Sequence, residues 1–133
     1  MLKQWLIIFC KMIKGTFVKN TPFIKISVGW GQTMRAPFVV LDTGFSGYLQ
    51  ITSKIAAELG LEPSGLVPVR VANGQVIKIP TAFAFADMEG EKKYMEVFIT
   101  DGLPLAGIGF LSRFGYKAEI DCKNRTIALE KVI

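Results

Sequence analysis

A single Asp-Thr-Gly triplet directly behind an apolar run is the feature that most constrains this chain. Residues 38–41 are Phe, Val, Val and Leu, and they predict a buried strand; the triplet, residues 42–44, then places one carboxylate on a turn. A carboxylate beside so much apolar surface is costly to ionise unless hydrogen bonds or a shared proton compensate. The triplet occurs once, so a pair of such carboxylates requires two copies of the chain.

Length and composition favour one mostly β domain. The chain has 133 residues, of which 50% are hydrophobic, and this is enough to bury a substantial core. Its Val, Ile, Thr and Phe residues occur in short runs that Gly, Pro and Asn interrupt, which is typical of strands and turns. One or two short helices are expected among these strands.

Several kinds of chemistry are excluded by what the chain lacks. It contains no histidine, so Ser-His and Cys-His nucleophiles and His-ligated zinc are absent. Its two cysteines, Cys10 and Cys122, form no CxxC motif, and we expect free thiols in a reducing compartment. Other carboxylates lie on or beside predicted turns and are not spaced as a metal site: Asp87, Glu89, Glu91, Asp101 and Asp121. No metal and no cofactor are therefore predicted.

The net charge of +5 raises the question of a nucleic-acid partner. The basic residues are scattered singly or in pairs and do not alternate with aromatic residues. Binding to nucleic acid needs several phosphate contacts at once, so a solvated basic surface is the prediction, with no nucleic-acid partner.

Residues 1–11 are predicted to be an N-terminal extension or a short packing segment, with the domain proper at residues 12–133. The apolar run at residues 5–10 is much shorter than the roughly 20 residues that span a bilayer. A cytoplasmic protein is therefore expected, although this run leaves secretion or membrane association open, as well as whether Met1 or Met12 begins the functional chain.

Local signals predict the order of the elements. Thr52 or Ser53 can cap a short helix that ends at Gly60, and a second short helix is expected to end at Gly115. The dipeptide Asn73-Gly74 is a strong hairpin signal. The expected helices are residues 54–59 and 108–114, and the expected strands are residues 15–18, 23–28, 35–41, 48–52, 66–71, 75–79, 81–86, 93–100, 116–122 and 126–132.

This order resembles that of the retroviral-type, retropepsin-like (clan AA) single-domain aspartic proteases. The sharpest part is FVVLDTGFSG at residues 38–47, and the apolar-apolar-Gly element Leu105, Ala106 and Gly107 before a helix agrees with it. The small prokaryotic members with an Asp-Thr-Gly-Phe motif are the most similar. The resemblance implies a closed or partly open acid-protease barrel, a homodimer, and an aspartic endopeptidase that acts on peptides or proteins.

The resemblance also implies roles for the triplet. Asp42 of each subunit would share one proton with its partner and activate a water molecule. Thr43 would bond to the partner's loop and hold the two carboxylates coplanar. Gly44 would let the backbone approach the carboxylate and give it an N–H.

Two neighbouring segments are expected to contact substrate, although each has a second interpretation. Phe45 either packs in the core, which we favour, or contacts substrate beside Ser46. The hairpin tip resembles the flap that closes over substrate, although an ordinary surface hairpin would use the same residues; the tip is Ala72, Asn73, Gly74 and Gln75. The alternative function is a non-catalytic dimerisation or peptide-binding module with the same fold.

Overall fold

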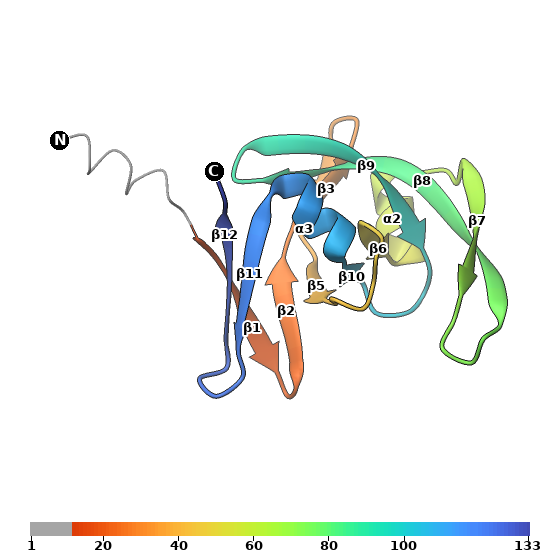
Figure 1. Cartoon of the computed structure of the whole chain (residues 1–133). Helices are drawn as coiled ribbons and strands as arrows, with labels where there is room; N and C mark the ends of the chain where they lie inside the picture. The colour runs from red at the N-terminus through yellow and green to blue at the C-terminus, as the bar shows by residue number, and fades with distance from the viewer. Residues whose placement is uncertain (1–11) are drawn as a thin grey trace.

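The computed structural model describes residues 12–133, and the predicted N-terminal extension, residues 1–11, lies outside the described residues. The described part is mostly β, as expected, with two short helices (Figure 1). The elements are β1 (Met12–Val18), β2 (Thr21–Lys25), β3 (Ser27–Trp30), β4 (Thr33–Arg35), β5 (Phe38–Leu41), β6 (Leu49–Ile51), α2 (Ser53–Leu59), β7 (Gly65–Arg70), β8 (Val76–Met88), β9 (Glu91–Ile99), β10 (Leu105–Ala106), α3 (Ile108–Phe114), β11 (Tyr116–Asp121) and β12 (Thr126–Lys131).

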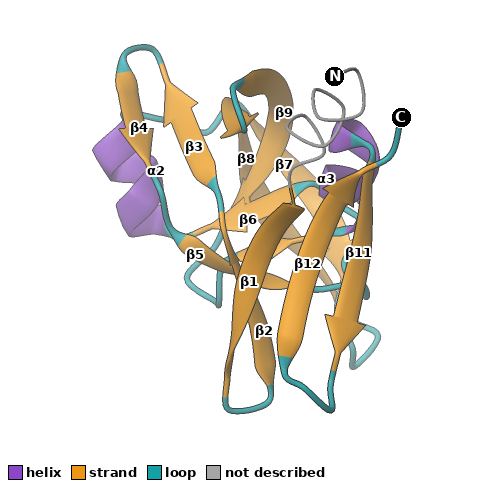
Figure 2. Ribbon diagram, turned by 90° about the vertical axis from the view of Figure 1, so that its left-hand side faces the viewer, coloured by secondary structure: helices purple, strands orange, loops and turns teal. Residues whose placement is uncertain are grey.

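The strands form one twisted sheet that does not close on itself. Its order is β11-β12-β1-β2-β5-β10-β6-β9-β8-β3-β4, and β7 pairs with β8 outside this path. Of the two predicted forms, closed or partly open, the open one is observed. The helix α2 lies beside the β3–β4 hairpin and α3 lies beside β11, at separate places on the sheet (Figure 2). Neither helix of the described part is long and apolar enough to cross a membrane.

A single hydrophobic core lies between the folded sheet and the two helices. Ile24, Ile26 and Val28, which alternate with other residues along their segment, are all at most 1% exposed. The helix α3 contributes Phe110 and Phe114, whose rings pack together with centroids 5.0 Å apart. Burial of these apolar side chains is the main favourable term that holds the sheet in its folded shape.

Two predicted strands are each divided in the structure. The expected strand 23–28 is split at Ile26, because the chain leaves the ladder with β1 and β5 and joins the ladder with β4 and β8. The expected strand 35–41 is split at Ala36 and Pro37, where proline has no N–H for a ladder. Both divisions mark a change of neighbouring strand, which the pattern of a single segment does not contain.

At Pro80 the structure joins two segments that the sequence predicts as separate strands. The expected strands 75–79 and 81–86 are one strand, β8. The proline is tolerated because β9 pairs with β8 only from Thr81 onwards, so Pro80 lies just outside that second ladder. The long β8 therefore carries the β7–β8 hairpin on one end and the β8–β9 hairpin on the other.

The caps of α2 are those that the sequence predicts. Thr52 is the N-cap, and its hydroxyl accepts a hydrogen bond from the Ile55 N–H (3.2 Å). The helix ends at Gly60, which has φ of 73° and therefore adopts the left-handed conformation that favours glycine.

Replacement of Thr52 by alanine is expected to lower the free energy of unfolding by about 1 kcal/mol, because one N–H of the first turn loses its acceptor. Urea denaturation followed by circular dichroism measures this loss. Thr52→Ser keeps a hydroxyl at the same position and should restore most of the stability. An equal loss in the serine variant would contradict the capping role.

Tyr116, at the start of β11, gives a second stability prediction. Its ring stacks on Phe114 (centroids 5.9 Å apart), and its hydroxyl donates to Glu89 Oε1 (3.3 Å). Burial raises the pKa of Tyr116 well above its usual range, and the negative charge of Glu89 and the hydrogen bond to it add to this effect. The unfolded chain therefore loses this proton first as the pH rises.

The stabilising effect of the neutral phenol is complete below about pH 10 and is lost progressively above it. We expect the free energy of unfolding of the wild type to fall over this alkaline range, and to fall less steeply in Tyr116→Phe. Urea denaturation at a series of alkaline pH values tests this. Equal slopes for the two proteins would show that Tyr116 does not contribute to the dependence of stability on pH.

Candidate active site

The buried strand β5 places Asp42 at its carboxyl end. Val39 is fully buried and Leu41 is 4% exposed, so the strand that precedes the carboxylate is held in the core. The Asp42 N–H donates to the Ala106 carbonyl (2.9 Å), which extends the parallel pairing of β5 and β10 by one residue. Asp42 is itself partly buried, and its position at the strand end is the one that the sequence pattern indicates.

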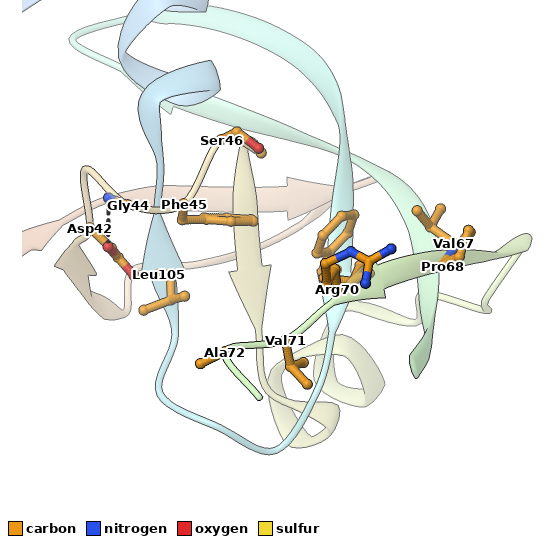
Figure 3. Close-up of a pocket in the computed structure, with 13 residues that line it drawn as sticks. Asp42, Gly44, Phe45, Ser46, Val67, Pro68, Arg70, Val71, Ala72 and Leu105 are labelled. Carbon is orange, nitrogen blue, oxygen red and sulfur yellow. Dashed lines mark hydrogen bonds between the residues drawn. The ribbon is translucent and has the colours of Figure 1, made fainter. Parts of the chain in front are cut away.

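The turn after Asp42 directs a backbone donor at the carboxylate. The Gly44 N–H donates to Asp42 Oδ1 (2.9 Å; Figure 3), and the Phe45 N–H donates to the Asp42 carbonyl (3.2 Å). A Cβ at position 44 would lie 3.3 Å from Asp42 Oδ1, closer than most such contacts. Thr43 is exposed, and none of the hydrogen bonds within residues 12–133 uses its hydroxyl.

The rest of this loop is held by the start of α3. Three N–H groups donate to it: Gly107 to the Tyr48 carbonyl (3.0 Å), Ile108 to the Phe45 carbonyl (2.8 Å) and Gly109 to the Gly47 carbonyl (3.0 Å). A Cβ at Gly107 would lie 2.3 Å from the Phe45 oxygen, a distance at which the loop could not stay in place. The element Leu105, Ala106 and Gly107 thus lies against the Asp42 loop, and its small residues permit the close approach.

A cavity of about 750 Å³ lies between the Asp42 loop and β7. Figure 3 shows Asp42 on one side, the β7 residues on the other and Phe45 between them. Its lining residues are Asp42, Gly44, Phe45, Ser46, Gly47, Val67, Pro68, Val69, Arg70, Val71, Ala72, Phe98 and Leu105. Of the residues selected from the sequence, the lining includes Asp42, Gly44, Phe45, Ser46, Ala72 and Leu105, and it does not include Thr43, Asn73, Gly74, Gln75, Ala106 or Gly107.

Phe45 forms part of the cavity wall. Its ring is partly buried and packs on Phe98, with centroids 5.6 Å apart and planes at 56°. Phe45 does not belong to the hydrophobic core, so the favoured expectation of core packing does not describe its position. Gly47 leaves space for the ring, because a Cβ there would lie 2.6 Å from it.

The tip of the β7–β8 hairpin is held by its own hydrogen bonds. The Gly74 N–H donates to the Val71 carbonyl (2.9 Å), and the Gln75 N–H donates to Asn73 Oδ1 (2.9 Å). The Asn73 amide also donates to Gln75 Oε1 (3.3 Å). The side chains of Asn73 and Gln75 are therefore engaged with each other, and β7 supplies most of the hairpin's contribution to the cavity.

Sequence reasoning missed Arg70, Phe98 and the β7 valines as lining residues. The alternation of residue types in these segments predicts strands. It does not indicate which of their side chains line a cavity. Which edge of the hairpin faces the Asp42 loop depends on how β8 pairs with β9, a contact between distant segments.

The cavity wall offers the chemistry of one carboxylate. Among the described residues that line the cavity, Asp42 and Arg70 are the charged ones, and none is a cysteine. A lone carboxylate can accept a proton from water, but an acid–base cycle also needs a donor.

Comparison with known proteins gives the fold of this chain. No family model and no curated protein matches it. Among solved structures, the chain is similar to a retropepsin-like aspartic protease from Rickettsia conorii, with a TM-score of 0.64 and 21% identity over 91% of both chains. It is also similar to the EIAV protease complexed with the inhibitor HBY-793, with a TM-score of 0.60 and 14% identity over 77% of this chain and 96% of the other. The chain therefore has the retropepsin-like fold.

Proposed function

We propose that this protein is an aspartic endopeptidase that acts as a homodimer. The observation that carries the proposal is the position of Asp42: a carboxylate at the end of a buried strand, bonded by the Gly44 N–H, on the wall of a cavity of about 750 Å³. The fold, shared with a retropepsin-like aspartic protease, supports the same chemistry.

The dimer follows from the need for two carboxylates. Each chain carries one Asp-Thr-Gly triplet, so the second carboxylate has to come from a second copy across a two-fold axis. Thr43 is exposed at this position, with its hydroxyl available to the partner's loop. Two carboxylates at such close range share one proton, because both cannot ionise cheaply.

The shared proton makes the pair acid and base together. The ionised Asp42 removes a proton from a water molecule between the two side chains, and the water oxygen attacks the peptide carbonyl carbon. The protonated partner donates its proton to the carbonyl oxygen, so a neutral tetrahedral diol forms. The carboxylate that took the water's proton then protonates the leaving nitrogen as the C–N bond breaks, while the partner carboxylate takes a proton from one diol hydroxyl. A carboxylic acid and an amine leave without a covalent acyl-enzyme, and the pair again holds one proton.

The substrate would be an extended peptide. β7 pairs with β8 on one edge and borders the cavity, so a peptide can lie beside it and bond through its main chain. Apolar side chains of the peptide would contact Phe45, Phe98 and Val69.

Digestion of a peptide library over acidic to neutral pH tests this function. We expect cleavage within peptides, with a rate per chain that rises with protein concentration until the dimer is fully formed. Sedimentation measured at the same concentrations relates activity to assembly. A stable monomer at high concentration, or binding of peptides by a dimer with no cleavage at any pH, would reject the enzyme; the second outcome would support the peptide-binding module.

A further inference from the structure

Within residues 12–133, Arg70 is the one cationic residue that lines the cavity. It is exposed, and it takes part in none of the ion pairs found within residues 12–133. The segment before these residues contains no Asp or Glu that could pair with it. By contrast, Arg35 has a carboxylate partner, Glu58, with Nε and Oε1 3.4 Å apart. A positive charge thus borders the cavity without a carboxylate of this chain beside it.

The β7–β8 hairpin holds the Arg70 side chain in place. Arg70 pairs with Val76 across the hairpin, and its Nη1 donates to the Gly74 carbonyl (3.0 Å). One of five guanidinium N–H groups is used in this bond, and the others remain free for a ligand. Figure 3 shows the guanidinium on the β7 side of the cavity, across from Asp42.

We infer that Arg70 makes the cavity selective for peptides that carry an Asp or Glu side chain among apolar neighbours. The planar guanidinium fork matches the two oxygens of a carboxylate. The other β7 lining residues, together with Phe45 and Phe98, are apolar and suit the neighbouring side chains. This inference rests on the proposed function and adds the class of substrate to it.

The inference predicts a specific dependence on pH. A glutamate in a peptide has a pKa near 4.3, so it binds Arg70 as a carboxylate above about pH 5.5 and is neutral below about pH 3. The ratio of cleavage rates for a Glu peptide and its Gln counterpart cancels effects of pH on Asp42 itself. Lys78 is a second cation on this hairpin. Its cross-strand neighbour Pro68 lies on the same hairpin face as Arg70.

The experiment compares matched peptides at equal concentration. A peptide that the wild type cleaves is synthesised with Glu, Gln or Lys at each position in turn, and kcat/KM is measured by competition from pH 3 to pH 7. We expect a preference of roughly tenfold for Glu over Gln at one position near neutral pH, and no preference at pH 3. Arg70→Gln should remove the preference, and Arg70→Glu should replace it with a preference for Lys.

Lys78→Gln is the matched control, since it removes a charge from the same hairpin and should leave the ratio unchanged. Thermal unfolding checks that all variants fold. A Glu-to-Gln ratio near one in the wild type at every position, or the same ratio in Arg70→Gln as in the wild type, would overturn the inference. Loss of the preference in Lys78→Gln, with Arg70→Gln unaffected, would overturn it as well.

The two proposals fail in different ways. Cleavage without a preference for acidic residues would support the endopeptidase and contradict the selective role of Arg70. If the wild type cleaves nothing, the endopeptidase is rejected, and the role of Arg70 is decided by fluorescence anisotropy, which measures the binding of fluorescently labelled library peptides in matched Glu and Gln forms. Tighter binding of the Glu peptide, lost in Arg70→Gln, would support it, whereas equal binding would reject it.

Discussion

Replacement of Asp42 by asparagine is expected to lower the rate of peptide hydrolysis at least about a thousandfold. The amide has nearly the size of the carboxyl group, but it neither accepts the proton of the attacking water nor donates one to the peptide carbonyl. General acid–base catalysis contributes about 10²- to 10⁴-fold, and the substitution removes both members of the pair in a homodimer. Initial rates on one well-cleaved peptide measure the loss.

The fold of this variant should be unchanged, because the asparagine oxygen still accepts the Gly44 N–H that Asp42 Oδ1 accepts now. Circular dichroism and sedimentation check the fold and the assembly. Asp101→Asn is the matched control: Asp101 is exposed, accepts a hydrogen bond from the Ser53 N–H (3.4 Å) and does not line the cavity. Hydrolysis by Asp42→Asn at a tenth or more of the wild-type rate would exclude Asp42 as the catalytic group.

The parts of the fold that the sequence predicts well depend on neighbouring residues. Thr52 and Gly60 define α2 at both ends, and Gly115 ends α3, because capping and the left-handed conformation act within one or two turns. The hairpin at Asn73-Gly74 forms for the same reason. The strand before Asp42 is also local, since its burial follows from its apolar residues.

The parts of the fold that the sequence predicts poorly depend on contacts between distant segments. Ile26 lies at a change of sheet partner, and nothing in its own segment marks that change. The place of Phe45 in the cavity wall depends on Phe98, more than fifty residues later in the chain, and the place of Arg70 depends on how β8 pairs with β9. The triplet therefore indicates the proposed chemistry, while the lining proposed to select a substrate becomes visible only in three dimensions.

Among the residues packed behind the Asp42 loop, Gly107 is the one whose substitution is expected to have the largest effect. Its φ of −106° and ψ of −173° suit any residue, so an alanine there would suffer no backbone strain. The obstacle is space alone: the new Cβ would lie 2.3 Å from the Phe45 oxygen and 2.5 Å from the Gly47 oxygen, both backbone atoms. The loop that carries Asp42 would have to move away from α3.

We expect Gly107→Ala to lower the free energy of unfolding by about 1–3 kcal/mol, as other overpacked sites do. Peptide hydrolysis should fall further, by about a hundredfold, because a displacement near 1 Å misplaces the two carboxylates around their shared water. Urea denaturation and steady-state kinetics measure the two effects separately. Gly102→Ala is the matched control, since its Cβ would meet nothing closer than Gln50 Nε2 at 3.6 Å. If both alanine variants behave alike, the close contact at Gly107 does not position the Asp42 loop.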